Sequence, residues 1–180
     1  IKSVNLLCNN SKHDLPILSL NTQEQLNLSF VYLSDDAKEF AYTFVKCNSS
    51  WDKSENVFFH DFAEGMEEKF ITDFEFSENT STNFIHYNLD FPSPESKFLM
   101  SGNYVLIVRE TETSKVVLTQ KFFVVENKTI ISPHPQEPID FESKHTHHQI
   151  NFTVNHSMVS SDNPMRDFKA VVIQNGRYDN

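Results

Sequence analysis

Three histidines close together in the sequence, His145, His147 and His148, form the densest group of potential metal ligands. On a β-strand, His145 and His147 would share one face while His148 would point to the other. A zinc site requires three or four converging ligands, with further groups that orient them. No cysteine lies nearby, and Glu142 is the obvious candidate carboxylate. The pattern favours a polar strand over a metal site, and we predict neither a bound metal nor a cofactor.

Motifs for catalysis are also scarce. The sequence has no Gly-x-Ser-x-Gly nucleophile motif, and its three glycines form no phosphate-binding loop. Carboxylates crowd one stretch, where a solvated acidic surface explains them and the spacing of an EF-hand calcium loop is missing. This stretch contains Asp61, Glu64, Glu67, Glu68, Asp73, Glu75 and Glu78. We therefore predict a protein without catalytic residues and without a small-molecule substrate.

The two cysteines, Cys8 and Cys47, admit two interpretations. If their strands lie side by side, a disulfide between them would stabilise the fold by about 4 kcal/mol in the chain-entropy model. Two buried free thiols fit the sequence at least as well, and two cysteines cannot build a Cys-rich zinc site. Cysteine usage therefore leaves the redox compartment open.

Aromatic residues outside the strand pattern are the remaining chemical signal. Trp51 follows a predicted strand end in Cys47-Asn48-Ser49-Ser50-Trp51. On a sandwich loop, a Trp can stack on a sugar or form a protein hot spot, although it more often covers the open end of the core. With Tyr32 or Tyr178 as further stacking groups, Trp51 supports an alternative function, a carbohydrate-binding or adhesive module of a surface protein.

Net charge restricts the partners. Lys and Arg number 15 against 25 Asp and Glu, which gives a formal net charge of −10 without any basic stripe. Nucleic acids and anionic membrane surfaces both require clustered cations, so we expect neither as a partner. No apolar run reaches the roughly 18 residues of a transmembrane helix. The segment at Ile1 lacks a signal-peptide pattern, which we interpret as a mature or trimmed chain.

Apolar and polar residues alternate along most of the segments that are expected to form the fold and to position the side chains discussed above. This alternation is typical of strands with one buried and one solvated face. The alternating segments are Leu26–Phe30, Phe40–Phe44, Phe74–Phe76 and Ile85–Leu89. Tyr104–Val108 and Phe122–Val125 are apolar on both faces and are predicted as central strands. Roughly nine short strands between Val4 and Glu126 then form an all-β, antiparallel sandwich of the immunoglobulin or fibronectin type.

Helix signals are weak, and we expect no helix longer than two turns. The candidates are Asp35–Glu39 and Phe62–Lys69. Tyr104 follows a glycine-containing turn at the start of its strand, where immunoglobulin-like folds often carry a tyrosine corner. A tyrosine whose hydroxyl lies in water fits this position equally well.

A change of composition after Val125 indicates a domain boundary. Residues 127–138 hold three of the seven prolines and no alternation, which predicts a linker. Alternation resumes at Ile150–Val154 and again at Phe168–Ile173, and Ile139–Phe141 is a further short candidate. We predict an immunoglobulin-like domain over 1–126 and the first strands of a second, incomplete β-sandwich over 139–180. The chain is then a fragment of a longer protein.

Several short segments follow one another in an order that resembles a known family. They are Leu15–Leu20, Leu26–Phe30, Lys46–Trp51, Asp73–Thr80, Ile85–Tyr87, Ser101–Leu106, Lys121–Glu126, His148–Phe152, Asn163-Pro164 and Val172–Arg177. In this order, and over nearly the whole chain, they resemble the amino-terminal half of the type IX secretion system plug protein family. Each segment is weakly specific by itself, and their combination is what carries the resemblance.

The resemblance implies a periplasmic protein with immunoglobulin-like amino-terminal domains and no catalytic residues. It implies an association with the large outer-membrane translocon barrel of the type IX system, so that the protein is peripheral to the membrane and not inserted in it. It further implies that the protein closes the periplasmic opening of that barrel when no substrate passes. A stiff sandwich with a polar face suits this role, but it also suits many binding modules or an accessory domain of an enzyme.

Overall fold

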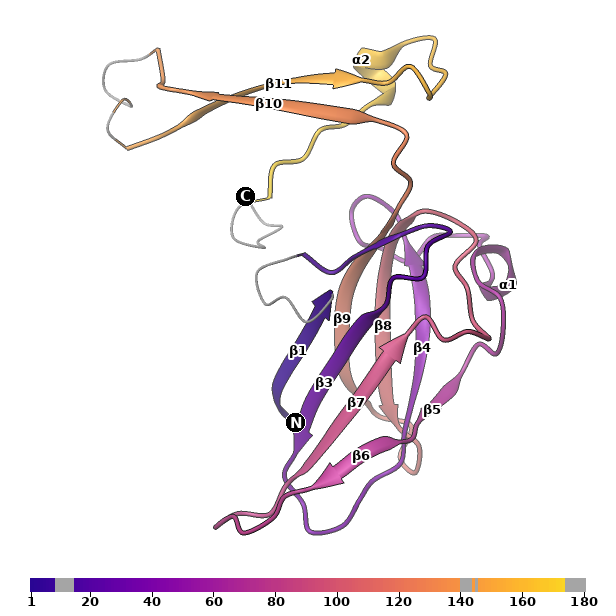
Figure 1. Ribbon diagram of the computed structural model, residues 1–180. Helices are drawn as coiled ribbons and strands as arrows, with labels where there is room; N and C mark the ends of the chain where they lie inside the picture. Colours follow the sequence, from indigo (N-terminus) through magenta and orange to yellow (C-terminus); the bar gives the residue numbers. More distant parts are fainter. Residues whose placement is uncertain (9–14, 140–143, 145, 174–180) are drawn as a thin grey trace. The chain divides into compact units, whose positions relative to one another are not determined.

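The computed structural model describes residues 1–8, 15–139, 144 and 146–173. The chain divides into two compact units, Ile1–Glu126 and Asn127–Asn180. The first unit contains strands β1 to β9 and helix α1, and the second contains β10, β11 and α2 (Figure 1). The boundary between the units falls where the composition of the sequence changes.

The first unit is a β-sandwich, and one of its sheets has four antiparallel strands (Figure 1). In spatial order they are β1 (Lys2–Cys8), β3 (Leu26–Tyr32), β7 (Ile85–Phe91) and β6 (Asp73–Phe76). The side chains alternate across this sheet, as the sequence pattern predicts, so that Leu26, Leu28 and Phe30 on β3 are fully buried.

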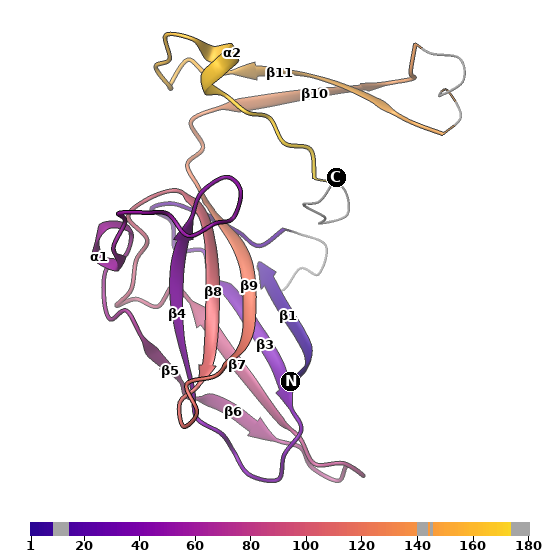
Figure 2. The ribbon, with the colours of Figure 1, turned by 180° about the vertical axis from the view of Figure 1, so that it is seen from behind.

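The second sheet of the sandwich has five strands and faces the viewer in Figure 2. Its order is β2 (Ile17–Ser19), β9 (Val116–Val125), β8 (Gly102–Glu110), β4 (Phe40–Cys47) and β5 (Lys69–Ile71). Its pairs are antiparallel except that β2 runs parallel to β9. The predicted fold class and the central position of β8 are thus confirmed.

Aromatic side chains fill the space between the two sheets. Phe44 on β4 lies at the centre of this core, with its ring centroid 5.2 Å from Phe91, 5.1 Å from Phe98 and 5.8 Å from Phe122. These rings meet at tilted or edge-to-face angles, which are the preferred arrangements of aromatic pairs. Interlocking rings of this kind make the sandwich a rigid support for its loops.

Tyr104 at the start of β8 forms the predicted tyrosine corner. Its side chain is fully buried, and its hydroxyl donates a hydrogen bond to the carbonyl oxygen of Met100 at 2.7 Å. Gly102 has a φ of +147°, and a Cβ atom there would collide with the side chain of Lys46. The Lys46 ammonium donates a hydrogen bond to the carbonyl oxygen of Ser101 at 2.9 Å. Because Gly102 has no Cβ atom, the Lys46 side chain has room to make this second hydrogen bond to the turn.

Helix α1 (Phe59–Phe62) is one turn long, and its first and last residues are buried. At its start, the carboxylate of Asp61 accepts a hydrogen bond from the backbone N–H of Phe58 at 2.7 Å. The predicted helices at Asp35–Glu39 and Phe62–Lys69 are wrong, since the first segment is irregular and α1 ends where the second begins. Asp35–Glu39 consists mostly of exposed polar residues, and Gly65 lies in the middle of Phe62–Lys69, where it disfavours a helix.

The second unit contains the antiparallel pair β10 (Ile130–Gln136) and β11 (Gln149–Asn155), followed by α2 (Pro164–Asp167). The prediction of a linker over 127–138 is therefore wrong. Residues two apart direct their backbone groups to the same edge of a strand, so Pro133 and Pro135 remove donors from one edge only. The other edge of β10 stays available for pairing with β11.

The sequence predicts two further strands in this unit, Phe168–Ile173 and Ile139–Phe141. Phe168–Ile173 is irregular, so its prediction as a strand is wrong. Of Ile139–Phe141, only Ile139 lies among the described residues, and it is exposed. The described part of residues 127–173 has no buried side chain. A second β-sandwich in a longer chain stays a prediction.

Candidate functional site

The histidine cluster does not converge on a metal site where the structure describes it. His147 and His148 are both exposed, and His147 Nδ1 lies 2.8 Å from the hydroxyl of Thr146. His145 and Glu142 lie outside the described residues. In the described ranges, no three His, Cys, Asp or Glu side chains gather closely enough to hold a metal ion.

Cys8 and Cys47 stand on strands of different sheets, and no disulfide joins them. The Cys8 thiol lies 3.5 Å from the carbonyl oxygen of Ile17, whereas the Cys47 thiol lies 3.9 Å from that of Val45. Burial raises the pKa of Cys47, which disfavours the reactive thiolate. The structure corresponds to the interpretation without a disulfide.

Trp51 packs against the outer face of β9. Its ring centroid lies 5.3 Å from that of Phe123, and the Lys121 ammonium lies 4.7 Å from the ring centre, in a cation–π contact. Tyr32 is half-buried on the other sheet, with its ring 5.6 Å from that of Phe40. Trp51 and Tyr32 thus lie at different sheets and do not form a common sugar-stacking surface, and Tyr178 lies outside the described residues.

The acidic stretch is exposed throughout, as a solvated surface requires. Asp61 serves as the helix cap already described, and Asp73 and Glu75 alternate with phenylalanines on β6. Because these groups stand on a helix, on loops and on a strand, the structure spreads them over the surface.

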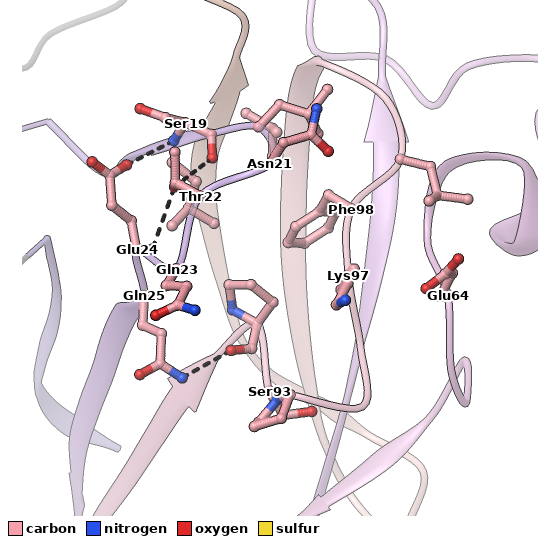
Figure 3. A pocket seen from close by; sticks show the side chains of 16 residues that line it. Ser19, Asn21, Thr22, Gln23, Glu24, Gln25, Glu64, Ser93, Lys97 and Phe98 are labelled. Atoms are coloured by element: carbon pink, nitrogen blue, oxygen red, sulfur yellow. Dashed lines mark hydrogen bonds between the residues drawn. The ribbon is translucent and has the colours of Figure 1, made fainter.

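A hollow of about 910 Å³ opens in the first unit, between the connection from β2 to β3 and the segments that follow β7 (Figure 3). Three segments line it, Leu18–Gln25, Pro92–Pro94 and Lys97–Leu99, together with Glu64 and Val124. Sequence reasoning missed this hollow because neutral amide and hydroxyl side chains in loops form no recognisable motif.

Hydrogen bonds fix the rim of the hollow (Figure 3). The carboxylate of Glu24 accepts from the backbone N–H of Ser19 at 2.9 Å, and the Thr22 hydroxyl donates to the Ser19 carbonyl oxygen at 2.8 Å. The bond from the Ser19 N–H lowers the pKa of Glu24. The Gln25 side-chain amide donates to the carbonyl oxygen of Pro92 at 2.9 Å, which ties two rim segments together.

The lining of the hollow is largely polar and includes three ionisable side chains, those of Glu24, Glu64 and Lys97. Asn21 and Gln23 offer amide groups above a floor to which the buried side chains of Leu18, Phe98 and Val124 contribute. Such amides can donate and accept hydrogen bonds with a polypeptide backbone. None of the 16 lining residues is a histidine or a cysteine.

Comparison with known proteins identifies the first unit. The family model described as the type 9 secretion system plug protein 1st domain matches residues 1–126. The chain belongs to this family. The matched residues coincide with the first structural unit, so the plug domain is the sandwich that carries the hollow and β6. Membership associates the chain with type IX protein secretion, as the resemblance in the sequence predicts.

A solved structure extends the likeness beyond the plug domain. The crystal structure of a hypothetical protein from Parabacteroides merdae ATCC 43184 matches with a TM-score of 0.80 and 28% sequence identity. The match covers 87% of this chain and 39% of that chain, so this chain spans well under half the length of its structural relative. No curated protein matches. Among the described helices, none has the length and apolar character needed to span a membrane.

Proposed function

We propose that the protein is a non-enzymatic plug of the type IX secretion system. It binds the outer-membrane translocon barrel from the periplasm and closes the periplasmic opening of that barrel when no substrate passes. The observation that carries this proposal is the match of residues 1–126 to the plug domain of the family. The protein is peripheral to the outer membrane and associates with it through the barrel.

The physical properties of the sandwich support this role. A stopper must keep its shape against a wide pore, and the interlocked rings around Phe44 resist deformation because close-packed interiors have low compressibility. It must also stay soluble when it is released, which a net charge of −10 favours. Docking on the barrel is reversible, so that release can occur by competition with a substrate or a second state of the translocon.

A permeability measurement tests the proposal. In a strain whose barrel still assembles, deletion of the gene for this protein should make the cells sensitive to large antibiotics that an intact outer membrane excludes. Restoring the gene should reverse the effect, and removing the barrel as well should abolish it, because the leak runs through the barrel. Unchanged resistance after deletion, with the barrel present, would contradict the plug function.

Physical association supplies a second test. The full-length protein, purified from detergent-solubilised envelopes, should carry the translocon barrel protein with it. Mass spectrometry of the purified material identifies the partner. A preparation that contains no barrel protein, from cells that produce it, would count against the proposal.

A further inference from the structure

Among the described residues, the first unit has four sheet edges, and β6 differs from the other three because it exposes two aromatic side chains. Edge strands present unpaired backbone groups, which proteins protect with short strands, lysine, proline or bulges. Such devices are present at β1, whose pairing is irregular between Lys2 and Asn5. β2 has only three residues and directly follows Pro16. β5 also has only three residues, and it begins at Lys69.

β6 (Asp73–Phe76) lacks lysine, proline and any irregularity in its register with β7. It is the outermost strand of its sheet (Figures 1 and 2). All four of its residues are exposed, including Phe74 and Phe76, whose relative exposures are 39% and 55%. β6 is short and carries two carboxylates, as protected edges often do, but it also exposes two phenylalanines side by side, and exposed apolar side chains that gather on a surface mark interaction sites.

The two phenylalanines point toward the inside of the sandwich and extend its core. Phe74 stands opposite Tyr87 and Phe76 opposite Ile85, and both partners on β7 are fully buried. The Phe74 ring lies 5.5 Å from that of Tyr87 and 5.9 Å from that of Phe76. The aromatic layer of the core therefore continues to the edge of the sheet, where it is uncovered.

The backbone of the same two residues faces the open edge. Just beyond β6, the N–H of Ser77 donates to the carbonyl oxygen of Phe84 on the β7 side at 2.8 Å. Backbone groups alternate in direction along an antiparallel strand, so Glu75 also faces β7 while Phe74 and Phe76 face outward. A strand added at this edge would gain hydrogen bonds and aromatic contacts from the same two positions.

The charges on and next to β6 indicate what kind of segment could pair with it. Asp73 and Glu75 alternate with the phenylalanines, and Glu78 follows just beyond the strand. β6 itself contains no lysine or arginine. A segment that pairs here therefore needs apolar side chains toward the core and basic side chains on the opposite face.

We infer that β6 is the docking strand for an extended segment of the translocon barrel protein, in which apolar and basic side chains alternate. The segment adds to the sheet β1-β3-β7-β6 as a fifth strand, a mode known as β-augmentation. This inference rests on the proposed function, and it names the surface through which the plug would be held.

Placing lysines at the aromatic positions tests the inference. The full-length variant with Phe74→Lys and Phe76→Lys should bring down at least about tenfold less barrel protein from solubilised envelopes, because it loses the aromatic anchors and repels a basic segment. The matched control carries Phe58→Lys and Val116→Lys, two exposed positions away from β6 with the same change of charge. The control should stay within about twofold of the unaltered protein.

The outcomes separate the two proposals. If the unaltered protein brings down no barrel, the plug function fails and the docking strand fails with it. If the unaltered protein and the β6 variant bring down equal amounts, the plug function stands and the docking strand is wrong. Urea unfolding of both variants checks that a lost interaction does not come from a lost fold. If the β6 variant is unfolded, the milder single substitution Phe76→Thr is tested in its place. Less barrel protein brought down by this variant would support the docking strand, and an unchanged amount would contradict it.

Two further measurements identify the occupant. The variant with Asp73→Lys and Glu75→Lys should also bind less barrel, and equal or stronger binding would contradict a basic segment. A photoreactive phenylalanine analogue at position 76, with position 58 as the control, should cross-link to an extended segment of the barrel protein. Cross-links that lead only to a second copy of this chain, or to another protein, would overturn the inference.

Discussion

Two buried tyrosine hydroxyls hold segments that the sheet ladders do not reach. The hydroxyl of Tyr87 accepts from the backbone N–H of Lys38 and donates to its carbonyl oxygen, both at 2.9 Å. The hydroxyl of Tyr104 donates to the carbonyl oxygen of Met100. Burial raises the pKa of both tyrosines, so the hydroxyls stay protonated at neutral pH and keep their donor. Each tyrosine thus joins the core to a loop.

Removing these hydroxyls should destabilise the first unit. We expect Tyr104→Phe and Tyr87→Phe to lower the free energy of unfolding by about 0.5–1.5 kcal/mol for each hydrogen bond lost, because backbone groups of Met100 and Lys38 lose their partner. Tyr87→Phe should cost more, since it leaves two backbone groups unpaired. Urea unfolding monitored by circular dichroism measures the change. The control is Tyr32→Phe, whose hydroxyl makes no hydrogen bond with the described residues, and an equal loss there would contradict the argument.

The carboxylate of Glu24 should make the stability of the hollow's rim depend on pH. The hydrogen bond from the Ser19 N–H lowers the pKa of Glu24 in the folded state. A lowered pKa contributes stability above the ordinary value of the group, about 4.3, and that stability is lost as the pH falls through the folded-state pKa. Glu24→Gln should therefore be less stable than the unaltered protein at pH 7.

The difference between the two proteins should shrink as the pH is lowered through the acidic range, because the unaltered carboxylate becomes neutral as well. Urea midpoints of both proteins, measured from neutral to acidic pH at constant salt, check this expectation. A difference that stays constant over the whole range would show that Glu24 acts through packing and not through its charge.

At the scale of elements, β4 is the strand on which the aromatic core depends most. Phe44→Ala should lower the free energy of unfolding by about 3–5 kcal/mol, because it removes a ring that contacts Phe91, Phe98 and Phe122 and leaves a cavity. Phe58→Ala is the matched control, since 76% of that side chain is exposed. The control should change the stability by less than about 0.5 kcal/mol. Comparable losses in the two variants would contradict the assignment of the core.

Two kinds of strand could be predicted from the sequence, those with one solvated face and those, β8 and β9, that contain a short run of apolar residues. Along β3 and β7, polar residues alternate with buried ones, and this period marks a strand wherever it stands in the fold. β10 was missed because Pro133 and Pro135 resemble linker residues, although their spacing confines the missing donors to one edge. Helix α1 was missed because two buried positions in four residues give no helical period.

The candidate sites were harder to predict than the strands, for a physical reason. The alternation of Phe74 and Phe76 with charged residues is the same whether or not the facing sheet covers the two rings, so the sequence does not reveal that they are exposed. The hollow is formed by loops that meet only after the sheets have packed, as the bond between Gln25 and Pro92 illustrates. Local sequence patterns carry no information about contacts between segments that are far apart in the chain.

On the scale of the whole molecule, stability is concentrated in one of the two units. The described side chains that are buried all lie within residues 1–126, which is also the range of the plug domain. The described part of residues 127–173 consists of a two-stranded sheet, one helical turn and irregular segments, without a buried side chain. A two-stranded sheet without a covered face is at best marginally stable in water.

A polypeptide of residues 1–126 should therefore fold by itself, with a free energy of unfolding within about 1 kcal/mol of that of the same unit in the longer chain. Residues 127–180 alone should show no cooperative unfolding transition, because the described part of this segment lacks the buried apolar surface that such a transition requires. Circular dichroism and urea titration of the two polypeptides and of the intact chain measure both expectations. If the first polypeptide unfolds at a much lower urea concentration than the intact chain, the second unit contributes directly to the stability of the plug domain. The docking experiments at β6 would then have to be interpreted with both units present.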